Sequence, residues 1–141
     1  METAVPKEAM TARAIGRSLV ISTKHSIEVC KMLRGKPLAT GKKSLEDVLA
    51  FRKSVPTPRY GTETAHRKGG RRGRYPLTVC DAILKLLDSV EANAQHKGMS
   101  TGNLVISHIA AGQGPKIPHH GRHGRIAKRT HVEVVVAEMK K

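Results

Sequence analysis

Residues 114–130, "GPKIPHHGRHGRIAKRT", gather the side chains best suited to binding anions. They include five lysines and arginines, three histidines, three glycines and two prolines, with no acid. Arginine and lysine donate charged hydrogen bonds to phosphate oxygens, and histidine can join them, transfer protons near neutral pH or bind a metal ion. A stretch this polar cannot build a core of its own, so we expect it to depend on a partner. Phosphate binding, metal binding and ribonuclease chemistry are the candidates.

Three histidines, His119, His120 and His123, provide little support for a catalytic or metal site. Both kinds of site usually include a carboxylate that orients the imidazole or completes the ligand set, and residues 92–132 contain no aspartate or glutamate. The glycines form neither a P-loop nor a dinucleotide-binding motif. We therefore expect no catalytic residue, no metal and no cofactor, and we expect the histidines to extend hydrogen bonding to phosphate and ribose.

The whole chain is basic, with 26 lysines and arginines against 11 acids in 141 residues and a formal charge of +15. The excess lies mainly in the Gly/Pro-rich connections, including residues 54–75, where six cations face one acid. Nucleic acid is the leading counter-charge for such a distribution. Only Phe51, Tyr60 and Tyr75 are aromatic, which favours recognition of backbone and shape over base stacking.

Two cysteines, Cys30 and Cys80, have neither metal-ligand spacing nor the number needed for a disulfide framework, so we expect small buried residues on helices. No apolar run approaches the ~18 residues of a membrane span, and the N-terminus lacks a secretory hydrophobic region. We expect the protein to work in a reducing, aqueous compartment.

The apolar pattern predicts the elements that must position the cations. A strand is expected over 17–22 and a helix over 23–34, and "SLED" predicts a second helix with Ser44 as its N-cap. A stripe of valine, isoleucine and leucine predicts a long helix from Pro76 to the stop at Gly98.

The β-branched runs 103–111 and 131–139 predict the arms of an antiparallel hairpin, with Val134 and Val136 on one face and Glu133 opposite. The middle would continue as a projecting ribbon or ordered loop held by a partner, and the alternative is a floppy, solvated loop. Loop 54–75 has the same two interpretations. Two separate basic segments favour folding onto phosphates, because glycine permits close approach and arginine binds phosphate in bidentate fashion.

Three classes of function fit these features: a structural component of a ribonucleoprotein, an architectural DNA binder with a basic β-arm, and a ribonuclease. A β-arm can enter a groove and bend DNA, but the second basic loop and the lack of an extensive apolar dimer face weigh against that class. The ribonuclease ranks last because the histidines have no carboxylate nearby.

Several segments resemble the large-subunit ribosomal protein twenty-two family, called seventeen in the older eukaryotic scheme. In chain order they are "GRYPLTVCDAILKLLDSVEANAQHKG", "NLVISHIAAGQGPK", "HGRI" and "THVEVVVAE". The similarity extends from Arg13 to Met139, and "SVPTP" and "GRYP" resemble the archaeal and eukaryotic branch.

The resemblance implies an α+β fold, with three helices packed on a small three-stranded antiparallel sheet and a long protruding β-hairpin. The hairpin would span 103–139, within a single domain over 13–141 that also carries the basic loop 54–75. A flexible segment over 1–12 would precede this domain.

The resemblance also implies a non-enzymatic constituent of the large subunit of cytosolic ribosomes that binds ribosomal RNA and supports assembly. The globular part would sit near the exit of the nascent-peptide tunnel, and the hairpin tip, around Lys116 to Ile126, would line its wall. Expected partners are ribosomal RNA, neighbouring large-subunit proteins and the nascent polypeptide, with no membrane and no small-molecule substrate.

Matched residue by residue, Lys116, Arg122 and Arg125 occupy basic family positions in "PK" and "HGR" that would contact RNA, and the arginines of "RRGR" would do so in loop 54–75. The tip "PHHGRHGRI" is a few residues shorter and less arginine-rich than the family pattern, and its histidines make the tip charge more sensitive to pH. The expected RNA-binding residues are Arg13, Arg17, Arg59, Arg67, Lys68, Arg71, Arg72, Arg74, Lys116, His119, His120, Arg122, His123, Arg125, Lys128 and Arg129.

Overall fold

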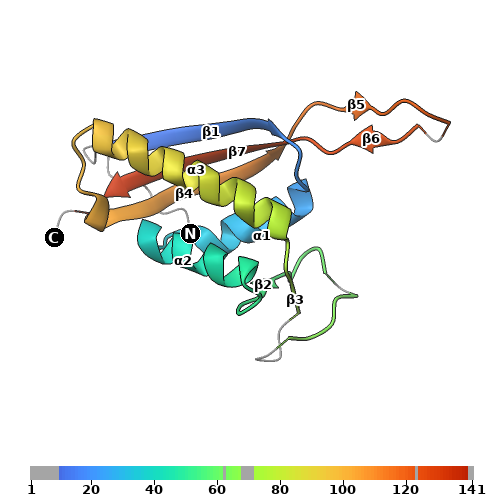
Figure 1. Cartoon of the computed structure of the whole chain (residues 1–141), viewed down its shortest axis with the longest axis horizontal. Helices are drawn as coiled ribbons and strands as arrows, with labels where there is room; N and C mark the ends of the chain where they lie inside the picture. The colour runs from blue at the N-terminus through green and yellow to red at the C-terminus, as the bar shows by residue number, and fades with distance from the viewer. Residues whose placement is uncertain (1–9, 62, 68–71, 123, 140–141) are drawn as a thin grey trace.

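The computed structural model describes residues 10–61, 63–67, 72–122 and 124–139 (Figure 1). The elements in chain order are β1 (Thr11–Leu19), α1 (Thr23–Leu33), α2 (Leu38–Leu49), β2 (Val55–Pro56), β3 (Gly73–Arg74), α3 (Leu77–His96), a 3₁₀ turn (Thr101–Asn103), β4 (Leu104–Gln113), β5 (Ile117–Pro118), β6 (Ile126–Ala127) and β7 (Thr130–Glu138). The α+β class, with three helices and a three-stranded sheet, is confirmed.

The central sheet is antiparallel with strand order β1-β7-β4. Its alternation follows the valines of β7, because Val132, Val134 and Val136 are fully buried while Glu133 and Val135 face the other side at intermediate exposure. The predicted hairpin arms and their facing are therefore confirmed.

Helices cover one face of this sheet, with α3 lying along β1 and β7 and α1 packing on β4 (Figure 1). The layer between them is filled by aliphatic side chains with no exposed surface, including Leu33, Leu45, Ile83, Leu87 and Ile106. Burying each such side chain stabilises the fold by about 1.5–3 kcal/mol, so this layer is the main source of stability.

The first strand lies earlier than predicted. Strand β1 ends at Leu19, so the expected strand over 17–22 is wrong at its C-terminal end, and Thr11 and Ala12, assigned to the flexible segment 1–12, belong to the strand. The inward side chains are the small Ala12 and Ala14, which a search for large apolar residues passes over. Residues 1–9 lie outside the described range.

Helix α1 agrees with the predicted range and α3 with the predicted long helix, but α2 begins six residues before the predicted N-cap. Ser44 lies inside this helix and is buried, so the predicted capping role is wrong. The missed turn contains Gly41, which reads as a helix breaker. A Cβ at Gly41 would lie 3.1 Å from Ile106 Cδ1, so glycine lets α2 approach the sheet.

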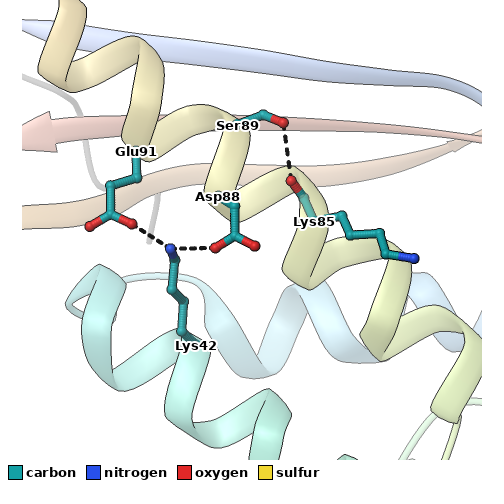
Figure 2. A network of polar contacts seen from close by, with 5 residues as sticks. All are labelled: Lys42, Lys85, Asp88, Ser89 and Glu91. Carbon is teal, nitrogen blue, oxygen red and sulfur yellow. Dashed lines mark hydrogen bonds and ion pairs between the residues drawn. The ribbon is translucent and has the colours of Figure 1, made fainter.

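A lysine bridge joins α2 to α3 (Figure 2). Lys42 Nζ donates to Asp88 Oδ1 at 2.5 Å and also to Glu91 Oε2, while Ser89 Oγ donates to the Lys85 carbonyl at 3.0 Å. Burial lowers the pKa of Lys42, but the hydrogen bonds to the two carboxylates outweigh it and the net pKa lies above its ordinary value. The bridge therefore holds the charged lysine in place between the helices.

Both cysteines are buried on helices, as predicted. Burial raises the pKa of Cys30 to about 12 and that of Cys80 to about 11. The reactive thiolate is therefore scarce at both positions at neutral pH.

Candidate nucleic-acid interface

Two basic segments leave the domain at the same end (Figure 1). We call residues 114–129 the hairpin arm and residues 54–75 the basic loop. The arm extends beyond the sheet near the start of α1, and the loop leads directly into the start of α3. Positive charge is thus concentrated at this end, although the two segments are separated by 38 residues in the sequence.

The hairpin arm is an ordered ribbon. Beyond the last sheet pair, Gln113 with Thr130, the Gly114 amide donates to the Arg129 carbonyl at 2.8 Å. Strands β5 and β6 then pair, and the His119 amide donates to the Arg125 carbonyl at 2.7 Å. These bonds support the predicted projection over a floppy loop.

Side chains of the arm point into solvent rather than into a core. Its cations Lys116, Arg122, Arg125 and Lys128 and its histidines His119 and His120 are exposed. Ile117 and Ile126 are also exposed, at 41% and 57%, so the arm buries little apolar surface of its own. A partner that supplies counter-charge would stabilise this extended conformation.

The base of the arm is braced against the end of β1. Arg129 Nη1 donates to the Ser18 carbonyl at 3.4 Å, the Ser18 amide donates to His131 Nδ1 at 3.1 Å, and Thr130 Oγ1 donates to the Ile21 carbonyl at 2.9 Å. A Cβ at Gly114 would meet Arg129 Cβ at 2.8 Å, so the two strands pack closely there. Arg129 is half-buried at the base of the arm, where Nη1 contacts β1 and Nε has no hydrogen-bond partner among the described residues.

The basic loop is closed at its base and anchored on α1. Strands β2 and β3 pair, and the Thr57 amide donates to the Arg72 carbonyl at 3.1 Å. Glu28, only 2% exposed, accepts the Arg59 amide at 3.1 Å. This buried acid holds the start of the loop against the helix, and Arg59 and Arg72 remain exposed.

Aromatic rings order several cations of the loop. The Arg59 guanidinium lies 5.3 Å from the centre of the Tyr60 ring, and Arg67 lies 5.5 Å from that of Tyr75. Arg74 Nε donates to Thr64 Oγ1 at 3.0 Å. Arg67 Nε also donates to the Gly73 carbonyl at 3.3 Å, so such contacts restrict side chains that remain exposed to solvent.

A crevice of about 420 Å³ lies between the starts of α1 and α3, and Lys128 reaches it from the arm. It is lined by His25 and Ser22 on one side and by Tyr75 and Thr78 on the other. Burial lowers the pKa of His25, and the positive charges of Arg74 and Lys128 lower it further. Both basic segments therefore act on one histidine, and an anion in this crevice would relieve their mutual repulsion.

The remaining predicted residues lie apart from this crevice or outside the described range. Arg13 Nε pairs with Glu133 Oε1 at 2.9 Å on the sheet face opposite the helices, and Arg17 is exposed on the same strand. Lys68, Arg71 and His123 lie outside the described residues.

Comparison with known proteins identifies the family of the chain. The ribosomal protein L22p/L17e family matches residues 14–137. The chain belongs to this family. A "Large ribosomal subunit protein uL22" of Methanocaldococcus jannaschii is 39% identical over 137 residues, which cover 91% of this chain and 88% of the relative. The proteins of the same name from Nanoarchaeum equitans (41% identity, 92% of this chain, 79% of the relative) and Archaeoglobus fulgidus (39%, 80% and 75%) are similar.

Membership makes this L22p/L17e protein a structural ribosomal protein and not an enzyme, as the resemblance implied. Within the described residues, no three or more histidines, cysteines or acids are grouped as metal ligands would be. The helices found in that part of the chain are too short or too polar to cross a membrane.

Sequence reasoning missed three residues of the candidate interface: His25, Glu28 and Tyr75. His25 carries no local signal, because its neighbours Arg74 and Lys128 are distant in the sequence. Glu28 carries a weak signal, because it is an acid between the apolar residues Ile27 and Val29 in an amphipathic helix.

Proposed function

We propose that this protein binds ribosomal RNA of the large subunit through the hairpin arm, the basic loop and the crevice between them. The arm would extend past the crevice and line the wall of the nascent-peptide exit tunnel. Phosphate neutralisation would join RNA segments during assembly, and neighbouring large-subunit proteins would complete the surroundings.

The observation that carries the proposal is that both basic segments border one crevice, which Lys128 lines from the arm and Tyr75 from the loop. Four exposed cations of the arm and four of the loop are described, and the arm and crevice contain no acid in the described residues. They are Lys116, Arg122, Arg125, Lys128, Arg59, Arg67, Arg72 and Arg74. RNA phosphates would supply the negative charge that these segments lack. Such contacts would recognise the RNA backbone, as expected from the sequence.

The tunnel role is supported by the shape of the arm. It advances from Gly114 to the turn at Gly121 in an extended conformation, which gives a reach of roughly 25 Å at about 3.3 Å per residue. A narrow, acid-free ribbon can pass between RNA segments that a globular domain could not enter. The relatives named uL22 support its placement in the large subunit.

A crosslinking experiment tests the tunnel role separately from RNA binding. A photoreactive amino acid replaces His120 at the tip, and ribosomes carrying a stalled nascent chain are irradiated. We expect crosslinks to both ribosomal RNA and nascent chain. Crosslinks to RNA alone would agree with the proposed RNA interface and refute the tunnel role. An absence of crosslinks to RNA and to the nascent chain would refute the RNA interface as well as the tunnel role.

A further inference from the structure

Helix α2 ends in an unusual way. The Phe51 amide donates to the Val48 carbonyl at 3.1 Å and the Arg52 amide to the Asp47 carbonyl at 2.8 Å, which is the bonding pattern of a Schellman motif. Phe51 occupies the left-handed position of this motif with φ of +58°. Glycine is the usual residue there, because a Cβ crowds the following carbonyl.

The other two helices show the ordinary solution. Helices α1 and α3 each place glycine two residues after their last helical residue, Gly35 with φ of +75° and Gly98 with φ of +73°. Only α2 has a bulky L-residue at this position. Phe51 is 61% exposed, so burial in the core does not explain why phenylalanine stands where glycine fits better.

The Phe51 ring belongs to an aromatic and cationic surface. It lies 5.2 Å from the Tyr75 ring, centre to centre, with a tilt of 52°. Tyr75 carries Arg67 at 5.5 Å and also lines the crevice beside His25. Arg52, next in the chain, is exposed, and its Nη1 lies 3.7 Å from the Asp47 carboxylate oxygen Oδ1. The exposed Phe51 ring is thus connected through the Tyr75 ring to the crevice where we propose that phosphates bind.

We propose that the open face of Phe51 stacks on an unpaired nucleobase of the RNA whose backbone occupies the crevice. This rests on the proposed RNA binding and deepens it. Every base offers a π-face, and nearby cations hold the flanking phosphates, so stacking needs no sequence-specific hydrogen bond. The sequence has only three aromatic residues and therefore favoured recognition of the RNA backbone. The proposed stack on Phe51 adds one contact to a base.

The test uses two ligands of equal charge. One is single-stranded oligoadenylate of about 12 nucleotides, within the length that a small binding domain covers, and the other is an abasic ribose-phosphate oligomer of the same length. Phe51 is the only phenylalanine in the chain, so its ring protons are assigned without ambiguity by NMR. We expect them to shift upfield with oligoadenylate and not with the abasic oligomer.

Affinities of variants give the second readout. Phe51→Gly and Phe51→Leu should weaken oligoadenylate binding by about 5- to 150-fold, the fold-change for one lost base–aromatic stack, and Phe51→Tyr should keep it. Binding of the abasic oligomer should stay unchanged in all three. Phe51→Gly fits the left-handed position, so loss of binding without loss of the fold would exclude a merely structural role.

Other outcomes overturn the inference. Equal loss for both oligomers, or no loss, would show that Phe51 does not stack on a base. If the variants bound RNA normally but failed to enter large subunits, Phe51 would belong to a contact with a neighbouring protein. Failure of the wild-type protein to bind purified large-subunit RNA in a salt-dependent way would instead refute the proposed function itself.

Discussion

Replacing Arg74 and Lys128 together by glutamine removes the two charges that converge on His25. One comes from the basic loop and the other from the hairpin arm, and both side chains are exposed. The double variant Arg74→Gln/Lys128→Gln therefore isolates the electrostatic part of binding at the crevice, with little expected change in the apolar core.

The magnitude follows from counterion release. If each of the eight exposed cations of arm and loop neutralises one phosphate, the logarithm of the affinity should fall with the logarithm of salt concentration at a slope of about −5.5 to −7. Losing two contacts should reduce the steepness by about 1.4–1.8. With an unchanged intercept at 1 M salt, this weakens binding about 15- to 30-fold at 0.15 M salt.

The assay is equilibrium binding of purified large-subunit RNA by the full chain over a range of salt concentrations. Lys97→Gln is the matched control, because Lys97 is an exposed cation at the far end of α3, roughly 30 Å from its start. It should keep the wild-type slope. Equal slopes for the double variant and the control would refute the placement of phosphates at this crevice.

Other predictions concern stability and titration. Lys42→Met should lower the free energy of unfolding by about 1 kcal/mol at pH 7 in urea denaturation. Lys85→Met should lower it by only about a few tenths of a kcal/mol, because the ion pair of Lys85 is exposed. Because the pKa of Lys42 is raised, the stability that Lys42 contributes should disappear as pH rises above about 10.5. NMR titration should give His25 a pKa below 6.5, and this pKa should rise when RNA binds. Because the lowered pKa lets the unfolded chain protonate His25 before the folded chain does, His25 should lower the stability of the fold as pH falls below about 6.5. An unchanged pKa with bound RNA would contradict an anion at the crevice. Gly61→Ala should destabilise the fold by about 1–3 kcal/mol in thermal denaturation, because its Cβ would lie 2.7 Å from the Thr57 carbonyl oxygen, and wild-type stability would show that the loop yields instead.

Strong periodicity made part of the fold predictable. Strand β7 places valine at alternate buried positions, β4 is rich in β-branched residues, and α1 and α3 carry apolar stripes that end at Gly35 and Gly98. The N-terminal part of β1 and the start of α2 escaped prediction because inward positions there hold alanine and glycine. At Ala12 and Gly41 the neighbouring element comes close, and small size rather than hydrophobicity is what the packing requires.

The charge of the candidate interface was visible in the sequence, but its geometry was not. The cations of 54–75 and 114–130 stand out in the sequence because no acids accompany them. The brace at Arg129 joins residues more than 100 positions apart, and so does the hydrogen bond between Ser18 and His131. No local sequence pattern encodes such pairs. The direction of the arm and its convergence with the loop at His25 could therefore not be predicted from the sequence.

The central claim is that the hairpin arm lies among RNA strands in the assembled subunit. Directed hydroxyl-radical probing tests it, with iron chelate attached through His120→Cys. Cys30 and Cys80 are buried and have raised pKa values, so the introduced thiol is the reactive one. Intact large subunits should show cleavage of ribosomal RNA at a compact set of nucleotides, different from the set cut from Lys97→Cys. Subunits that carry the His120→Cys protein but show no cleavage from that position would contradict the claim.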